Sequence, residues 1–196
     1  MRPVSADSPP PDGWIGVDLN TTGYIAVVAH PASGGVVMLG EQPEDAGIRE
    51  RGSSAGKHKK LKEARDRESS VRGGLNRRIA REIVKMARHL QCGIKLEDLS
   101  GAGFAGRQKP GVPLPFSRRD GSFYHLQNLV EARAHDAGVP VVLVDTALTS
   151  RCCSRCGERG IRRGKRFSCP HCGYTGHADA NAAFNIAAAA PGTGRA

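Results

Sequence analysis

The segment TSRCCSRCGERGIRRGKRFSCPHCGYTGHADANAAFNI, residues 149–186, carries the most specific pattern in the chain. It holds two Cys-x-x-Cys-Gly motifs, with 12 residues between the inner cysteines. Two such pairs can bind one tetrahedral zinc ion through four thiolates at about 2.3 Å. Glycine after each pair suits the tight turn that directs backbone amides at the bound sulfurs. The predicted zinc ligands are Cys153, Cys156, Cys169 and Cys172.

Two disulfide bonds are the alternative use of these cysteines, and Cys152 is an alternative ligand with poorer spacing. Disulfides are typical of small secreted domains. The first twelve residues are rich in proline and serine and contain no apolar core, so they predict a disordered tail and not a secretory signal. Zinc is therefore the favoured interpretation, with a short β-hairpin between the two cysteine pairs.

Asp179 follows the second cysteine pair and stands where an alanine-rich helix is predicted to begin. A carboxylate at this point is commonly an N-cap that accepts hydrogen bonds from the first free amides of the helix. The alternative is a functional carboxylate. The composition of the segment leaves both interpretations open.

Composition and charge predict a folded protein that binds a polyanion. The 196 residues are 39% hydrophobic and 5% aromatic, and no run approaches the roughly 18 apolar residues of a membrane-spanning helix. A soluble, cytoplasmic protein without a membrane partner is expected. The net charge of +10 is concentrated in residues 49–88 (net +9) and 151–166 (net +6). Nucleic-acid binding is the favoured interpretation, and a solvated basic surface is the alternative.

The N-terminal part of the chain predicts an antiparallel meander. Three short β-rich runs, at residues 14–20, 24–29 and 36–39, are separated by Thr-Thr-Gly and Ser-Gly-Gly. Asp18 lies at the end of the first run. An aspartate before Asn-Thr-Thr-Gly is usually a turn residue, so the local sequence does not by itself predict a metal ligand.

The next predicted element is an amphipathic helix, separated from the charged stretch 57–70 by Gly73-Gly74. Its apolar face consists of Leu75, Ile79, Ile83, Met86 and Leu90, which recur at intervals of three or four. A second stripe is basic and either follows a phosphate backbone or is simply solvated. This stripe consists of Arg78, Arg81, Lys85 and Arg88.

Residues 93–100 predict a short strand that contains Glu97 and Asp98. Adjacent side chains of a pleated strand point to opposite faces, so only one of the two can readily enter a site. Three predicted elements follow: a mobile loop at residues 101–120, a helix at 123–138, and a β-branched strand at 139–145 of the kind that is buried on both faces.

The motifs together resemble one family. TSxxCSxCG, CxxCG and DxNAAxNI are similar to the C-terminal end of TnpB, the transposon-encoded RNA-guided DNA nuclease that shares its ancestry with type V CRISPR effectors. GVDLN around Asp18 and IKLEDLSG around Glu97 resemble the first two motifs of RuvC-like nucleases. The resemblance covers roughly residues 13–190, with the motifs in the family's order.

The resemblance implies an α/β, RNase H-like (RuvC-like) fold, a mixed sheet flanked by helices, with a small inserted zinc ribbon. The nuclease domain is expected at residues 13–196 and the ribbon at 147–178. Asp18, Glu97 and Asp179 would converge on two Mg²⁺ or Mn²⁺ ions and hydrolyse DNA, with the zinc purely structural. The arginines of the ribbon expected to contact nucleic acid are Arg155, Arg162 and Arg163.

Departures from the family's pattern define the alternatives. Family members carry an additional N-terminal half that holds guide RNA and target duplex, whereas a short tail precedes Asp18 here. The resemblance implies guide RNA as a further partner, and the missing half implies a second polypeptide that supplies it. Gly121, Arg133 and Thr146 also replace residues typical of the family. The alternatives are a non-cleaving zinc-ribbon nucleic-acid-binding protein and a remnant of a longer mobile-element protein.

Overall fold

The computed structural model describes residues 13–20, 23–41, 57–99, 122–144 and 149–190. The predicted tail at residues 1–12 and the predicted loop at 101–120 lie outside these ranges. No helix in the described part of the chain combines the length and the apolar character needed to cross a membrane.

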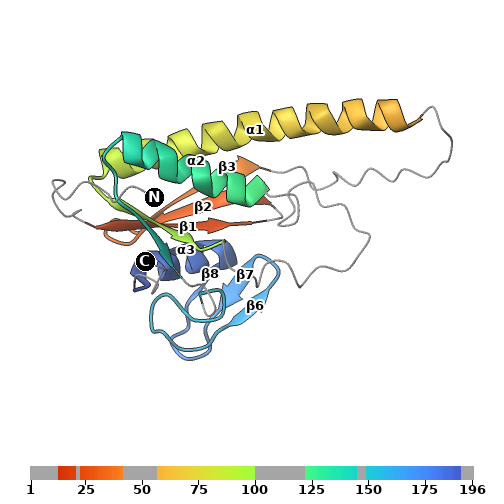
Figure 1. The fold of residues 1–196 in the computed structure, drawn as a ribbon. Helices are drawn as coiled ribbons and strands as arrows, with labels where there is room; N and C mark the ends of the chain where they lie inside the picture. Colours follow the sequence, from red (N-terminus) through yellow and green to blue (C-terminus); the bar gives the residue numbers. More distant parts are fainter. Residues whose placement is uncertain (1–12, 21–22, 42–56, 100–121, 145–148, 191–196) are drawn as a thin grey trace.

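A mixed five-stranded sheet in the order β3-β2-β1-β4-β5 forms the centre of the fold (Figure 1). The strands are β1 (Trp14–Leu19), β2 (Tyr24–His30), β3 (Gly35–Glu41), β4 (Gly93–Glu97) and β5 (Val141–Val144). β1, β2 and β3 form the predicted antiparallel meander, and β4 pairs parallel with both β1 and β5. The predicted RNase H-like α/β architecture is confirmed.

Helices cover both faces of this sheet. α1 (Lys57–His89) and α2 (Ser122–Asp136) pack on one face, and α3 (Ala178–Ala188) packs on the other (Figure 1). The alternation of β1 explains the division, because Ile15, Val17 and Leu19 are buried in the core cluster that α1 and α2 share. The intervening residues of β1, Gly16 and Asp18, therefore face α3.

α1 is one continuous helix, so the expectation that Gly73-Gly74 interrupts it is wrong. A glycine in a helix interior costs only about 1 kcal/mol relative to alanine. The apolar face that follows the two glycines is held by packing, since Ile79 and Ile83 are 2% and 0% exposed. That anchoring offsets the weak helix propensity of the glycine pair.

β5 differs from the expectation of a strand buried on both faces. Three of its four residues are only partly buried. The strand stands at the end of the sheet order, so among the described residues only β4 pairs with it. A run of valines therefore predicts a strand correctly but does not distinguish a central strand from an edge strand.

A second, three-stranded sheet follows β5 in the chain and lies below α3 in Figure 1. Its antiparallel strands are β6 (Ile161–Arg163), β7 (Arg166–Ser168) and β8 (Thr175–His177). β6 and β7 form the hairpin that was predicted between the two cysteine pairs. β8 runs directly into α3, which packs on β1 and β2 and so holds the small sheet against the large one.

Gly16 allows α3 to approach the sheet, and we expect Gly16→Ala to destabilise the protein. A Cβ atom at Gly16 would lie 2.0 Å from the carbonyl oxygen of Ala183 and 2.4 Å from the amide nitrogen of Ala187. Backbone atoms of a packed helix cannot yield locally, so the cost should be about 3 kcal/mol or more. Urea denaturation measures this loss.

Gly73→Ala in α1 is the matched control. A Cβ atom there would meet only the tip of Arg77, at 3.5 Å. Alanine has the higher helix propensity, so this variant should be unchanged or more stable by up to about 1 kcal/mol. Equal stability of the Gly16 and Gly73 variants would contradict close packing of α3 on β1.

Candidate active site and zinc site

The four predicted zinc ligands come together in the small sheet. The Sγ atoms of Cys153, Cys156, Cys169 and Cys172 all lie within 4.8 Å of one another. The Cys153–Cys172 and Cys156–Cys169 Sγ distances are both 3.6 Å. A tetrahedron with bonds of 2.3 Å has edges of about 3.8 Å, so the four thiols have the spacing that a zinc ion requires. Cys152 is not a member of this group.

The backbone around the cysteines has the turn geometry predicted from the two glycines. Gly157 and Gly173 have φ values of 77° and 73°, which residues with a side chain rarely adopt. Their amides donate to the carbonyls of Cys153 and Cys169 at 2.9 and 3.0 Å. The backbone amides of Cys172 and His171 lower the pKa of Cys169 to about 7, which favours the thiolate form that binds metal.

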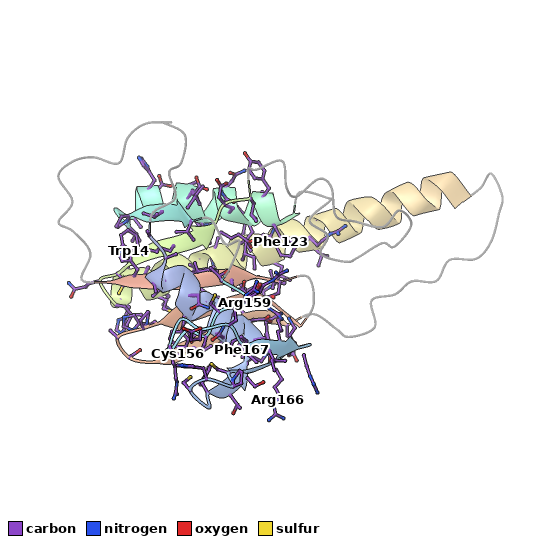
Figure 2. All side chains as sticks on the ribbon, turned by 90° about the horizontal axis from the view of Figure 1, so that it is seen from below. Trp14, Phe123, Cys156, Arg159, Arg166 and Phe167 are labelled. Atoms are coloured by element: carbon purple, nitrogen blue, oxygen red, sulfur yellow. The ribbon has the colours of Figure 1, made fainter. Side chains whose placement is uncertain are left out.

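A single aromatic side chain forms the core of this zinc ribbon. Phe167 on β7 is 0% exposed and packs with Cys153, Cys169 and Ala178. Figure 2 shows Phe167 beside Cys156 in the interior of the ribbon, with Arg166 directed away from it. So small a core cannot stabilise a domain alone, which makes metal binding the expected source of its stability.

Two of the predicted catalytic carboxylates lie at the ends of neighbouring strands. β1 and β4 run parallel, and their last paired residues are Val17 and Leu96. Asp18 and Glu97 are the next residue on each strand, so they occupy equivalent positions at the same edge of the sheet. Val17 and Leu96 are both buried in the core shared with α1 and α2. Because adjacent side chains of a strand point to opposite faces, Asp18 and Glu97 point toward α3.

Asp179 lies in the first turn of α3 and is 0% exposed. It is not the N-cap that its position allowed, because His177 fills that place and accepts a hydrogen bond from the Asp179 amide at 3.3 Å. Its carboxylate instead accepts from Arg162 Nη2 at 2.7 Å and from Lys165 Nζ at 2.5 Å. The ribbon hairpin therefore supplies two cations to this carboxylate.

The negative charges of Asp179 and Glu97 both act on the carboxyl group of Asp18. Burial and the negative charge of Asp179, with a smaller effect from Glu97, raise the pKa of Asp18 to about 7. A hydrogen bond from Asn20 Nδ2 at 3.0 Å and the charge of Arg162 act in the opposite direction. Mutual repulsion of this kind favours the binding of hard divalent cations, which relieve it.

Among the described residues, the cysteines are the only group of three or more potential ligands that meets around a single point. The three carboxylates are more dispersed, and both oxygens of Asp179 are engaged by the hairpin. Asp18, Glu97 and Asp179 are the residues that would hold divalent cations here, and bound cations would supply the activation of water for phosphodiester hydrolysis. The donor set, three carboxylates, is suited to Mg²⁺ or Mn²⁺.

Asp18 also predicts an unusual dependence of stability on pH. Its pKa in the folded state, about 7, lies above the ordinary value of 3.8. The protonated form therefore stabilises the fold, and this stability is lost as pH rises through about 7. In zinc-containing buffer without Mg²⁺, the stability advantage of Asp18→Asn over the wild type should grow by up to about 4 kcal/mol between pH 4 and pH 8. Urea denaturation at both pH values measures the stability difference between the variant and the wild type. A difference that is the same at both pH values would contradict the raised pKa of Asp18.

The residues predicted to bind nucleic acid lie on two surfaces. All four members of the α1 stripe, Arg78, Arg81, Lys85 and Arg88, are exposed. On the ribbon, Arg163 is exposed and the Arg155 guanidinium stacks on the Tyr174 ring at 4.5 Å. Arg162 differs from these, because its side chain turns toward Asp179 and is 33% exposed.

Several residues of the site were not identified from the sequence. Lys165 and Asn20 contact Asp179 and Asp18, and neither belongs to a spacing pattern that predicts such contacts. Asn181 and Asn185 also make buried hydrogen bonds to the segment that leads into the ribbon. Their place in the DANAAFNI segment was visible, but not their partners, because these are backbone atoms about 30 residues away.

Comparisons with known proteins agree with these features. Residues 123–186 match the family model of the Cas12f1-like TNB domain. The CRISPR-associated endodeoxyribonuclease Cas12f1 of Sulfoacidibacillus thermotolerans is 36% identical over 133 residues, which are 66% of this chain and 30% of that protein. The Cas12f1 of Syntrophomonas palmitatica is 31% identical over 113 residues, which are 56% of this chain and 21% of that protein. The chain thus spans less than a third of either curated relative.

Two solved structures share the fold. A CRISPR-Cas12f ternary complex has a TM-score of 0.67 at 20% identity, over 95% of this chain and 40% of that chain. A Cas12f1–sgRNA–target DNA complex has a TM-score of 0.64 at 20% identity, over 92% of this chain and 51% of that chain. The likeness extends over both the large sheet and the ribbon, since it covers nearly the whole chain.

Proposed function

The chain is related to the TnpB/Cas12-type RNA-guided endonucleases and spans part of their length, and on this basis we propose that it is a divalent-metal-dependent DNA endonuclease domain. The observation that carries the proposal is the placement of Asp18 and Glu97 at the ends of the adjacent strands β1 and β4, on the face of the sheet that α3 covers, with Asp179 in the first turn of α3. The raised pKa of Asp18, which Asp179 and Glu97 help to cause, supports it. In this proposal residues 13–196 form the nuclease domain, and residues 147–178 are an inserted zinc ribbon.

The three carboxylates would bind Mg²⁺ or Mn²⁺, which when bound activate a water molecule for in-line attack on a phosphodiester and stabilise the leaving 3′ oxygen. Asp18 and Glu97 would hold the ions from the sheet, and Asp179 from α3. Arg162 and Lys165 place positive charge at the same site. Their charge would attract the scissile phosphate and offset the negative charge that develops during its hydrolysis.

DNA is the proposed substrate, and the two basic surfaces are its proposed contacts. The α1 stripe would follow a phosphate backbone, while the exposed arginines of the ribbon would hold the strand near the carboxylates. One of the two solved structures is a complex with sgRNA and target DNA. Guide RNA, bound through a region that corresponds to the remainder of those relatives or through a second polypeptide, is therefore proposed as a further partner, and the cytoplasm as the location.

Cleavage of end-labelled single-stranded DNA by the purified chain tests the proposal. The reaction should proceed with Mg²⁺ or Mn²⁺ and stop when Ca²⁺ replaces them, since Ca²⁺ binds oxygen ligands with looser geometry. Addition of RNA that copurifies with the protein forms the second arm. DNA that stays intact in both arms, with binding retained, would contradict the proposal.

A nucleic-acid-binding protein that does not cleave is the second candidate. The two ion pairs of Asp179 favour it, because Arg162 and Lys165 compensate the charge of this carboxylate without a divalent ion. Such a protein would bind DNA without requiring Mg²⁺ and would leave it intact. The cleavage experiment therefore separates the two candidates directly.

Salt dependence of DNA binding tests the role of the α1 stripe. Each cationic side chain that neutralises a phosphate of duplex DNA contributes about 0.9 to the slope of log K against log salt. We expect Arg81→Ala combined with Lys85→Ala to weaken binding and to reduce this slope by about 2. Fluorescence anisotropy over a range of salt concentrations measures both quantities.

Glu82→Ala on the same exposed side of α1 is the control, since it removes charge of the opposite sign. It should leave the slope unchanged or make it steeper. If the double variant keeps the wild-type slope, the stripe is a solvated surface and the ribbon alone binds the DNA.

A further inference from the structure

Two asparagines of α3 hold the segment that leads into the zinc ribbon. Asn181 Nδ2 donates to the carbonyl of Cys152 at 2.7 Å, and its Oδ1 accepts from the amide of Ser154 at 2.9 Å. Asn185 Nδ2 donates to the carbonyls of Thr149 and Cys152 at 2.7 and 2.8 Å. We refer to Asn181 and Asn185 as the asparagine clamp.

The clamp is built for fixed geometry. Its two residues are four apart in the helix and so project from the same face. Asn181 is 0% exposed, and both ends of its amide are used, one as donor and one as acceptor. A side chain of another shape at position 181 would remove the bond to the partly buried amide of Ser154 and leave the Cys152 carbonyl with Asn185 as its remaining donor of the clamp.

The clamp lies between the two metal-binding groups. Its partners Cys152 and Ser154 flank Cys153, one of the four zinc ligands. Asp179 precedes Asn181 by two residues on the same helix. The hairpin between the cysteine pairs forms a second connection, because the amide of Ala178 donates to the carbonyl of Lys165 at 2.8 Å. The zinc ligands and Asp179 are thus tied to each other from two sides.

We propose that Asn181 and Asn185 are positioning residues through which zinc binding fixes the carboxylate of Asp179, so that the affinity of the carboxylates for a divalent cation depends on the zinc site. This inference rests on the proposed function for the role of Asp179. Zinc orders the segment around Cys153, the clamp transmits that order to the first two turns of α3, and the carboxylate is held toward Asp18 and Glu97. Linkage requires the reverse as well, so cation binding at the carboxylates strengthens zinc retention.

The test compares Asn181→Leu with Asn128→Leu, the same substitution at an exposed position of α2. Two affinities are measured on the folded, zinc-loaded chain: zinc retention against a chromophoric chelator, and Mn²⁺ binding by electron paramagnetic resonance. Loss of a partner outside the ligand shell typically weakens metal binding about 10- to 100-fold. We expect both affinities to fall by such a factor in the Asn181 variant and neither to fall in the Asn128 variant.

The readouts distinguish the outcomes. A loss of zinc retention with unchanged Mn²⁺ affinity would overturn the inference, because the clamp would then serve the ribbon alone. Absence of Mn²⁺ binding by the zinc-loaded wild type would overturn both the inference and the carboxylate assignment in the proposed function. Unchanged zinc retention in the variant would overturn the inference and leave the proposed function standing.

A second measurement applies if Asn181→Leu does not fold. Mn²⁺ is titrated into wild-type protein with and without zinc, while the emission of Trp14, the single tryptophan, reports whether the large sheet is intact. Trp14 is on β1, at the end of α3 remote from Asp179, where Lys95 contacts both the Trp14 ring and the carbonyl of Ala189. Weaker Mn²⁺ binding with unchanged emission is expected, and equal Mn²⁺ binding in both states would overturn the inference.

Discussion

Asp18→Asn is expected to reduce DNA cleavage by more than about 100-fold, because removal of a direct metal ligand should exceed the 10- to 100-fold cost of losing a partner outside the ligand shell. The substitution keeps the size of the side chain and removes its charge. Asn20 can still donate to the new amide oxygen, so the local hydrogen bond of 3.0 Å need not be lost. Single-turnover cleavage rates at saturating Mg²⁺ measure the effect.

The combination of lost activity and gained stability makes this prediction specific. A structural aspartate would lose stability on substitution, whereas Asp18 is destabilising when ionised, since burial and the charges of Asp179 and Glu97 raise its pKa to about 7. Asp98→Asn is the control, because the neighbouring side chain of an extended segment points to the other face. Equal losses of cleavage in the Asp18 and Asp98 variants would contradict the assignment of the site.

The large sheet was predictable because its signals are local. Strand alternation, short turns and the order of motifs depend on neighbouring residues, and the predicted meander and the apolar face of α1 agree with the structure. The zinc ligands were predictable for a similar reason, since each cysteine pair lies within one turn. Spacing alone also distinguished Cys153 from Cys152.

Features that depend on distant partners were not predictable. The continuity of α1 through Gly73-Gly74 depends on packing of its C-terminal half against the sheet. The edge position of β5 depends on sheet order, which its valines do not encode. The proposed common site of the three carboxylates also needed the resemblance, because residues about 80 apart in sequence carry no local sign of contact.

The ion pairs of Asp179 connect the four-cysteine cluster with the candidate carboxylate site in a way that neither motif predicts. An aspartate in the first turn of a helix is already favoured by the helix dipole. Here Arg162 and Lys165 add two charged donors from the hairpin that links the cysteine pairs. Disorder in that hairpin would withdraw both donors from a buried carboxylate. The zinc ribbon therefore contributes to the electrostatics of the candidate active site as well as to the proposed DNA surface.

Removal of the zinc should have the largest effect on stability. Structural zinc contributes about 10–16 kcal/mol to the folding of zinc-finger peptides, because the site does not exist in the unfolded chain. The ribbon has few other sources of stability, with Phe167 as its one fully buried large side chain. Treatment with a strong chelator, or Cys169→Ser, should therefore unfold the ribbon and lower the melting temperature by more than about 10 °C. Differential scanning calorimetry and metal analysis measure the two effects.

The large sheet should survive this treatment in part, because its core cluster does not include the ribbon. Cys152→Ser and Cys92→Ser are the matched controls, since both thiols lie outside the four-cysteine group. Cys92 is 4% exposed and packs in the core of the large sheet, so its substitution should affect stability without changing zinc content. Stoichiometric zinc in Cys169→Ser, or a melting temperature that the chelator leaves unchanged, would contradict the ligand assignment.

Because Asp179 is tied to the ribbon by Arg162 and Lys165, loss of zinc should also reduce DNA cleavage while the sheet that carries Asp18 and Glu97 stays folded.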